Sequence, residues 1–435
     1  ANIRHDGSSR FAKGYRWGTF PSFSAGWVMS EEKFMKSLNW DWLSFLKLRG
    51  SWGILGNERI GDDYFPYIAL MSFGNSLFYM ADGSVVSDKT ARPAILAVED
   101  ITWETTTSTD FGLDANFFNN RLQFHFDYYW KQTKDMLLKI EIPYFMGYNN
   151  PNTNAGKMST HGYDIELAWN DRIGDLQYGV NVNFSDFLSK IDYMNDGEQI
   201  SNGKIKRAGV LFNEYYGYVC DGIYQTQEEV NNSARTSTTV TVGDLKYRDI
   251  SGPDGVPDGI ISPEYDRVPL GNSLPRFQYG GTFNASYKGI DFSIAFQGIG
   301  KQNSYLSTAM VQPLRDNYGS VPSIIEGKYW SPFNTAEENL SARYPRLSNV
   351  SKSNNYATSS FWMFNGSYFR LKNLTLGYTL PETWTQKAGI DRVRFYISGS
   401  DLFCLSNFPD GWDPEMGASS YPITTSLVMG LQVNF

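Results

Sequence analysis

Apolar and polar residues alternate with a period of two along several stretches of this chain. One stretch places apolar residues on one side, namely Leu122, Phe124, Phe126, Tyr128 and Trp130, and mostly polar residues on the other, namely Gln123, His125, Asp127, Tyr129 and Lys131. The same alternation recurs over 176–185, 277–288, 290–297 and 427–435. Successive side chains of a β-strand point to opposite faces, so this period is typical of strands. The sequence therefore predicts an all-β protein whose strands have one apolar face.

These stretches differ from the strands of most soluble sheets. They run for about 10–14 residues, whereas strands in globular proteins are usually 5–6 residues long. Their polar positions are often Gly, Asn, Gln or Ser, and the middle of the apolar side carries almost no charge. A Lys or Arg that faces lipid at the bilayer midplane costs ~2–4 kcal/mol. The pattern favours strands that cross a membrane, with lipid on one side and a water-filled lumen on the other.

One stretch places charge on the apolar side. Arg370 and Lys372 have the same parity as Leu374, Leu376 and Tyr378. We expect these two cations to lie above the hydrocarbon, at the level of the lipid headgroups.

The connections between the stretches alternate between short and long. The short ones are 118–121, 171–174 and 288–289, and the long ones are 57–104, 138–154, 191–275, 302–364 and 404–423. Bacterial outer-membrane barrels have short periplasmic turns and long extracellular loops. The alternation therefore predicts a transmembrane β-barrel wall, with the C-terminus in the periplasm.

The number of strands is informative. Counting gives about eleven, at 19–29, 43–56, 105–118, 121–137, 155–170, 174–190, 276–288, 290–301, 365–380, 392–403 and 424–435. An open sheet edge in lipid leaves backbone groups unpaired, and closed bacterial barrels have an even number of strands. Plugged outer-membrane transporters have 22 strands. We therefore expect residues 1–435 to be the C-terminal part of such a barrel, about half of it, with the plug and the N-terminal strands outside this chain.

Composition excludes several other classes of protein. The chain is 41% hydrophobic, and its mean hydropathy is −0.39. It has no apolar run of the ~20 residues that a membrane-spanning helix needs. The formal net charge of −8 argues against nucleic-acid binding, which requires clustered basic residues.

The residues that usually carry catalysis are sparse. His5, His125 and His161 are the only histidines and form no zinc-type pair, and no nucleophile-elbow or phosphate-loop motif is present. Cys220 and Cys404 form no metal motif, although one disulfide between them is compatible with the sequence. The sequence predicts that the chain is not an enzyme. Because its start has no signal-peptide pattern, we expect it to begin inside a longer precursor.

Several motifs, spread from end to end, resemble those of the SusC-like branch of the TonB-dependent transporters. They are 10–27, Lys47-Leu48-Arg49-Gly50-Ser51-Trp52-Gly53, Phe118-Asn119-Asn120-Arg121-Leu122, Gly243-Asp244-Leu245-Lys246-Tyr247-Arg248-Asp249, Tyr368-Phe369-Arg370-Leu371-Lys372-Asn373-Leu374 and Asp413-Pro414-Glu415. The terminal Phe435, with Gly430 and Val433, is similar to the assembly signal of outer-membrane barrels, although Val428 departs from it.

The resemblance implies an outer-membrane importer energised by TonB. A SusD-like lipoprotein would act as its extracellular lid, and the substrates would be oligosaccharides or, in some members, peptides. The plug and the segment that contacts TonB lie N-terminal to the region that this chain resembles. Two alternatives stay open at this point: a passive porin, and a secreted β-rich protein that binds glycans.

Two groups of loop residues are candidate binding sites. Aromatic residues of the long loops could stack on sugar rings, namely Tyr215, Tyr216, Tyr305, Trp330 and Trp412. The alternative is that they pack the loops on themselves and on a lid. A carboxylate-rich stretch could bind calcium through Asp249, Asp254, Asp258 and Asp266, because Ca²⁺ prefers several oxygen ligands on a bent loop. The alternative, which the spacing favours, is a turn whose carboxylates cap its own amides.

Overall fold

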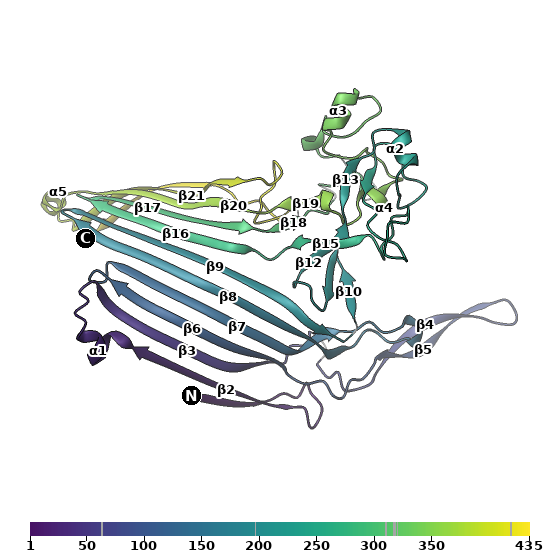
Figure 1. Ribbon diagram of the computed structural model, residues 1–435, viewed down its shortest axis with the longest axis horizontal. Coiled ribbons are helices and arrows are strands. Elements are labelled where there is room, and N and C mark those ends of the chain that lie inside the picture. The colour runs from purple at the N-terminus through teal and green to yellow at the C-terminus, as the bar shows by residue number, and fades with distance from the viewer. Residues whose placement is uncertain (62–63, 196, 309–310, 316–318, 320, 418–419) are drawn as a thin grey trace.

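A large antiparallel sheet forms the body of the computed structural model (Figure 1), which describes residues 1–435 apart from 62–63, 196, 309–310, 316–318, 320 and 418–419. The sheet has twelve strands, and neighbours in the sheet follow one another in chain order. They are β1 Asn2–Gly7, β2 Trp17–Val28, β3 Leu43–Asn57, β6 Glu104–Phe117, β7 Leu122–Lys139, β8 Asn152–Ile173, β9 Leu176–Met194, β16 Arg276–Tyr287, β17 Ile290–Lys301, β20 Tyr368–Thr379, β21 Arg392–Ser406 and β22 Ser426–Asn434. This meander, with β1 and β22 as its edges, confirms the predicted all-β barrel wall.

All eleven predicted strands are present, but the predicted number was one too low. The additional strand is β1, which pairs with β2 from Asn2 opposite Ser22 to Gly7 opposite Trp17. Its six residues contain Ile3 as their only aliphatic side chain. Because β1 has no apolar face, the period-two pattern could not reveal it.

The short and long connections lie at opposite ends of the sheet (Figure 1), as the sequence predicted. At the short-turn end, Phe118, Asn119 and Asn120 all have positive φ angles, between 53° and 64°. Asn tolerates this left-handed conformation better than most residues. The same end carries η1 Met29–Glu31, α1 Lys33–Lys36, α5 Glu382–Thr385 and η5 Gln386–Ala388.

The long loops carry their own elements. A hairpin made of β4 Leu70–Tyr79 and β5 Val85–Ile95 projects from the β3–β6 connection, and η2 Tyr144–Met146 lies between β7 and β8. The other strands of the loops are β10 Glu198–Ser201, β11 Lys204–Arg207, β12 Glu214–Tyr218, β13 Cys220–Ile223, β14 Leu245–Tyr247, β15 Arg267–Asn272, β18 Asn303–Tyr305 and β19 Met363–Asn365. Their helices are α2 Gln227–Asn231, η3 Ser323–Ile325, α3 Ala336–Ser341, α4 Lys352–Asn355 and η4 Ser360–Trp362.

The buried hydrophobic clusters of the described chain are built from loop residues, although one of them packs against Phe20 of β2 and Leu137 of β7. Every buried member of the four hydrophobic clusters is outside the twelve-stranded sheet. On the sheet, large apolar side chains remain exposed, such as Phe111 at 64% and Met429 at 80%. A sheet of a soluble sandwich would bury this face against a second sheet. In the part of the chain that the structure describes, no helix is long and apolar enough to span a membrane.

The prediction that Arg370 and Lys372 lie on the apolar side was wrong. The pairing of β20 with β21 shifts register between Leu371 and Asn373, and a β-bulge of this kind moves the following residues to the opposite face. Phe369 therefore stacks on Phe296 among the apolar side chains, while Lys372 lines the polar face. Because of the bulge, both cations lie on the polar side of the sheet, where Arg370 pairs with Asp413 and Lys372 pairs with Asp401.

Candidate functional site

The polar face of the sheet carries a cavity of about 920 Å³, a volume typical of ligand-binding clefts. Six consecutive strands contribute to it, from β7 to β20. Its polar lining includes the carboxylates of Asp127, Asp164 and Glu166 and the side-chain amides of Asn181 and Gln297. We call it the lumen cavity. It confirms that the polar positions of the alternating pattern share one concave side.

A connected network of charges organises the carboxylates near the lumen cavity. Arg49 Nη2 lies 2.6 Å from Asp127 Oδ2, and Arg49 Nε lies 3.2 Å from Asp114. His125 Nδ1 is 3.0 Å from the same Asp114. The strand register places Asp127 directly opposite Asp164. Carboxylates outnumber cations in this network, so this side of the wall is acidic and rich in hydrogen-bond acceptors.

The part of the wall formed by β20 and β21 carries hydroxyl, amide and paired charged groups in place of an excess of carboxylates. Thr375 and Ser398 hydroxyls lie 2.8 Å apart, and Asn373 donates a hydrogen bond to the same serine. Lys372 Nζ is 2.6 Å from Asp401 Oδ1. Hydroxyl, amide and paired charged groups can exchange hydrogen bonds with a hydrated solute, and a wet lumen favours such residues.

Three long loops pack into one body at the end of the sheet that carries the long connections (Figure 1). We call the described residues of 198–272, 303–365 and 407–417 the loop unit. One cluster joins Tyr344 and Trp362 of the second loop to Phe408 of the third. Another cluster joins Tyr247 of the first loop to Phe361 of the second. Because the clusters share members of the second loop, the three loops form a single packed unit and not independent segments.

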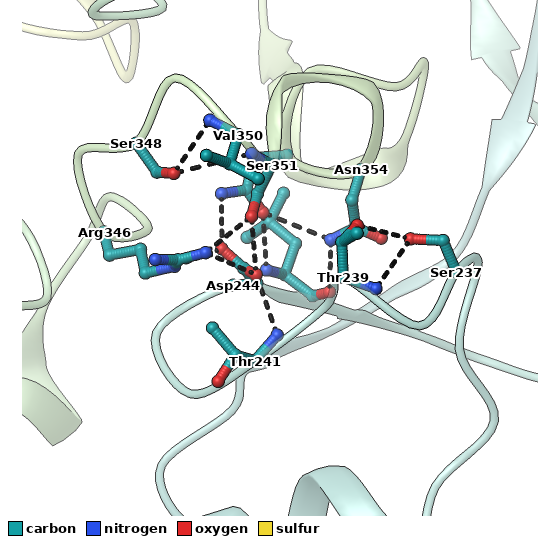
Figure 2. Close-up of polar contacts among 11 residues, drawn as sticks. Ser237, Thr239, Thr241, Asp244, Arg346, Ser348, Val350, Ser351 and Asn354 are labelled. Atoms are coloured by element: carbon teal, nitrogen blue, oxygen red, sulfur yellow. Dashed lines mark hydrogen bonds and ion pairs between the residues drawn. The ribbon is translucent and has the colours of Figure 1, made fainter.

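The carboxylate of Asp244 connects the first loop to the second through several polar contacts (Figure 2). Asp244 is fully buried. It accepts hydrogen bonds from Arg346 Nε at 2.7 Å and from the Ser351 hydroxyl and the Asn355 amide, both at 2.9 Å. The backbone N–H of Thr241 is a further donor, at 2.9 Å. A buried charge is tolerated only when it is paired and hydrogen-bonded, and these donors satisfy that requirement.

The five aromatic residues predicted to contact substrate occupy different places in the loop unit. Tyr215 and Tyr216 are buried on β12, and the rings of Tyr215 and Tyr305 lie 5.8 Å apart. Trp330 donates a hydrogen bond from Nε1 to a glutamine side chain, and Trp412 packs against the cluster that contains Trp362. None of the five lines the lumen cavity. Their role in packing is therefore visible, and their contact with a substrate stays a prediction.

Burial affects the ionisation of two of these tyrosines. It raises the pKa of Tyr215 and of Tyr305 above that of an exposed phenol.

The carboxylates predicted to bind calcium mostly accept hydrogen bonds from backbone amides. Asp266 is fully buried and accepts from the N–H groups of Ile250 at 2.8 Å and Ser262 at 2.7 Å. Asp249 accepts from Gly259 N at 2.7 Å. This is the arrangement expected of a turn that caps its own amides.

The other two carboxylates of this stretch lie at the surface. Asp258 accepts from the N–H of Ile260 at 2.9 Å, and Asp254 is exposed. Among the residues that the structure describes, no group of three or more His, Cys, Asp or Glu side chains is placed to hold a metal ion. Calcium binding stays a prediction, which titration with calcium followed by limited proteolysis of this stretch would test.

Sequence reasoning missed the residues that connect distant segments. The pairs Asp244–Arg346 and Arg370–Glu415 each join two motifs or loops far apart in the chain. Three of these four residues lie in the motifs that carried the family resemblance, but no local pattern indicates their partners. Both cysteines are free, so the disulfide that the sequence allowed is not formed.

Comparison with known proteins agrees with this architecture. Residues 1–398 match the family described as TonB dependent receptor-like, beta-barrel. The chain is 30% identical to TonB-dependent receptor P3 of Formosa agariphila over 99% of its own length and 43% of that protein. It is also 30% identical to TonB-dependent receptor SusC of Bacteroides thetaiotaomicron, over 100% of the chain and 42% of that protein.

A solved structure shows the same fold. The structure of the RagAB peptide transporter superposes with a TM-score of 0.78 at 24% identity, covering 100% of this chain and 45% of that chain. The chain thus spans less than half the length of the relatives that it matches. Members of the matching family are transport proteins of the outer membrane and not enzymes, in agreement with the sequence. The chain belongs to the TonB-dependent receptor β-barrel family, and within that family it is SusC-like.

Proposed function

We propose that this chain forms the C-terminal part of an outer-membrane importer of oligosaccharides or peptides. One observation carries the proposal: the twelve-stranded sheet leaves its apolar face uncovered while its polar face holds the lumen cavity. Such a sheet is stable when lipid covers its apolar face and water fills the space beside its polar face. The loop unit at one end provides the surface that solutes meet first.

The proposed importer implies two protein partners. A SusD-like lipoprotein would cover the loop unit from outside, and TonB would supply energy through a plug outside the region represented here. The C-terminus, at the short-turn end, would then lie in the periplasm. The similarity to SusC supports a glycan substrate and the similarity to the RagAB peptide transporter supports a peptide, so both classes belong to the proposal.

An uptake experiment with the full-length protein tests it. Cells that express or lack the protein would be given fluorescent neutral oligosaccharides or peptides, with and without a protonophore. The proposal predicts protein-dependent uptake that the protonophore abolishes, because TonB draws on the proton gradient. Uptake that persists with the protonophore would indicate a passive porin. Recovery of the protein from the soluble fraction without detergent would indicate a secreted binding protein.

A further inference from the structure

Arg370 is the one Lys or Arg that is buried among the described residues, with 3% of its surface exposed. It lies on β20, and its partners come from the β21–β22 connection. Arg370 Nη2 is 2.6 Å from Asp413 Oδ2, and Arg370 Nε is 2.5 Å from Glu415 Oε1. One guanidinium therefore holds two carboxylates of the same loop against the barrel wall, a geometry for which Arg is suited.

One of these carboxylates, that of Glu415, contacts the rim of the lumen cavity. Gln297 Nε2 lies 3.1 Å from Glu415 Oε2 and 3.3 Å from the Tyr368 hydroxyl. Gln297 and Tyr368 both line the lumen cavity, on the part of β17 and β20 nearest the loop unit. The loop that Arg370 holds therefore meets the cavity at its loop end.

The other side of this loop packs on the second loop of the loop unit. Phe408 is a buried member of the cluster around Trp362, and Trp412 packs against that cluster. The backbone N–H groups of Met416 and Gly417 both donate to the carbonyl of Asp413 and close a turn beside these contacts. Residues 407–417 thus form a compact strap, the part of the loop unit that attaches the second loop to the barrel wall.

We propose that Arg370 is a positioning residue that holds the strap, residues 407–417, across the loop end of the lumen cavity and thereby limits the size of solute that enters it. The inference rests on the proposed function, since entry from the loop end presumes that solutes pass along the polar face. Arg370 acts through the strap and need not touch the solute. Without the guanidinium, the carboxylates of Asp413 and Glu415 would be left as neighbouring like charges in a partly buried place, and the strap would leave the wall.

The chain offers a matched control on the neighbouring strand. Arg394 of β21 also pairs with a carboxylate, that of Asp291 on β17, and its Nε lies 2.8 Å from Asp291 Oδ1. Neither residue lines the lumen cavity or belongs to the strap. Replacing Arg394 removes a guanidinium of the wall but leaves the strap in place.

The test measures access to the lumen cavity in the full-length protein in outer membranes. Thr282→Cys places a thiol in the lining of the cavity, in a background that carries Cys220→Ala and Cys404→Ala. The rate of modification would be measured with a small maleimide and with a polyethylene-glycol maleimide of several kilodaltons. Heat-modifiable migration on gels would verify that each barrel is folded.

We expect Arg370→Met, and separately the double variant Asp413→Asn/Glu415→Gln, to raise the rate with the bulky reagent about tenfold, because each shifts the strap toward its released state. The rate with the small reagent, and both rates of Arg394→Met, should stay unchanged. Equal rates in all variants, or a parallel rise for both reagents and for Arg394→Met, would overturn the proposal. Labelling requires no transport, so this result is independent of the uptake experiment.

Discussion

The carboxylate of Asp244 lies 2.7 Å from the guanidinium of Arg346, although 102 residues separate them in the chain. This ion pair is buried on the Asp244 side and connects two of the three loops of the loop unit. Removing one partner of a buried pair typically costs ~3–5 kcal/mol. We expect Asp244→Asn to destabilise the loop unit by about this amount, seen as faster hydrogen exchange and proteolysis at 241–245 and 346–355, with the barrel still heat-modifiable.

An exposed ion pair of the same loops is the control for that variant. Arg248 and Asp221 pair at 2.5 Å with 58% and 32% of their side chains accessible. Exposed pairs are usually worth ~0–1 kcal/mol, so Asp221→Asn should leave proteolysis of the loop unit nearly unchanged. Equal effects of the two substitutions would contradict the role assigned to Asp244.

Cys220 should be almost unreactive in the folded chain. Burial raises the pKa of its thiol to about 11. Only the thiolate attacks maleimides and disulfides, and roughly a thousandth of such thiols are ionised at pH 8. In a Cys404→Ser variant, labelling at pH 8 should be at least about 100-fold slower than after unfolding in urea. The raised pKa also means that the folded loop unit loses stability as the pH rises from about 9 to about 11. Rapid labelling of the folded protein at pH 8 would show that the thiol is accessible and ionised.

Gly217 is required where β12 meets the second loop. A Cβ atom at this position would lie 2.1 Å from the carbonyl oxygen of Thr358, which accepts a hydrogen bond from the N–H of Tyr218 at 2.9 Å. Overpacking of this kind costs typically ~1–3 kcal/mol, so Gly217→Ala should make the loop unit more sensitive to protease. Gly74→Ala, in the β4–β5 hairpin where no atom lies within 4 Å of the added Cβ, should have no such effect on the loop unit.

The sequence predicted the barrel wall well, because each wall strand is a local signal. Apolar and polar residues alternate along Leu122–Lys139 and Ile290–Lys301, because successive side chains of a strand point to opposite faces, one apolar and one polar. The pattern failed at β1, which has no apolar face, and at Arg370, where a bulge inverts the parity. A bulge depends on how two strands pair, so residues of one strand alone do not reveal it.

The loop unit was much less predictable. Its aromatic residues and carboxylates were found as residue types, but their partners come from other loops, as Asp244 and Arg346 show. Such contacts arise from tertiary packing and leave no periodicity in the sequence. The lumen cavity was predictable as a polar face, whereas the strap that crosses its loop end was not.

A charge on the apolar face should be tolerated poorly and a charge on the polar face well. Ile294 and Ala295 are neighbours on β17 and face opposite sides of the sheet, with Ala295 in the lining of the lumen cavity. We expect Ile294→Arg to destabilise the assembled barrel by ~2–4 kcal/mol, lowering the amount of heat-modifiable protein in the outer membrane. Ala295→Arg should assemble at the normal level. Similar losses for both variants would argue against a lipid-facing Ile294.

The environment of the two faces of β17 can be measured directly by electron paramagnetic resonance. Spin labels would be placed singly at Phe292, Ser293, Ile294, Ala295 and Phe296 of the full-length protein in lipid vesicles. The account predicts that accessibility to oxygen, which concentrates in lipid, is high at the even-numbered positions, and that accessibility to a water-soluble nickel complex is high at the odd-numbered ones. A profile without this alternation, or with low accessibility to both reagents at the even-numbered positions, would contradict a membrane-spanning barrel wall.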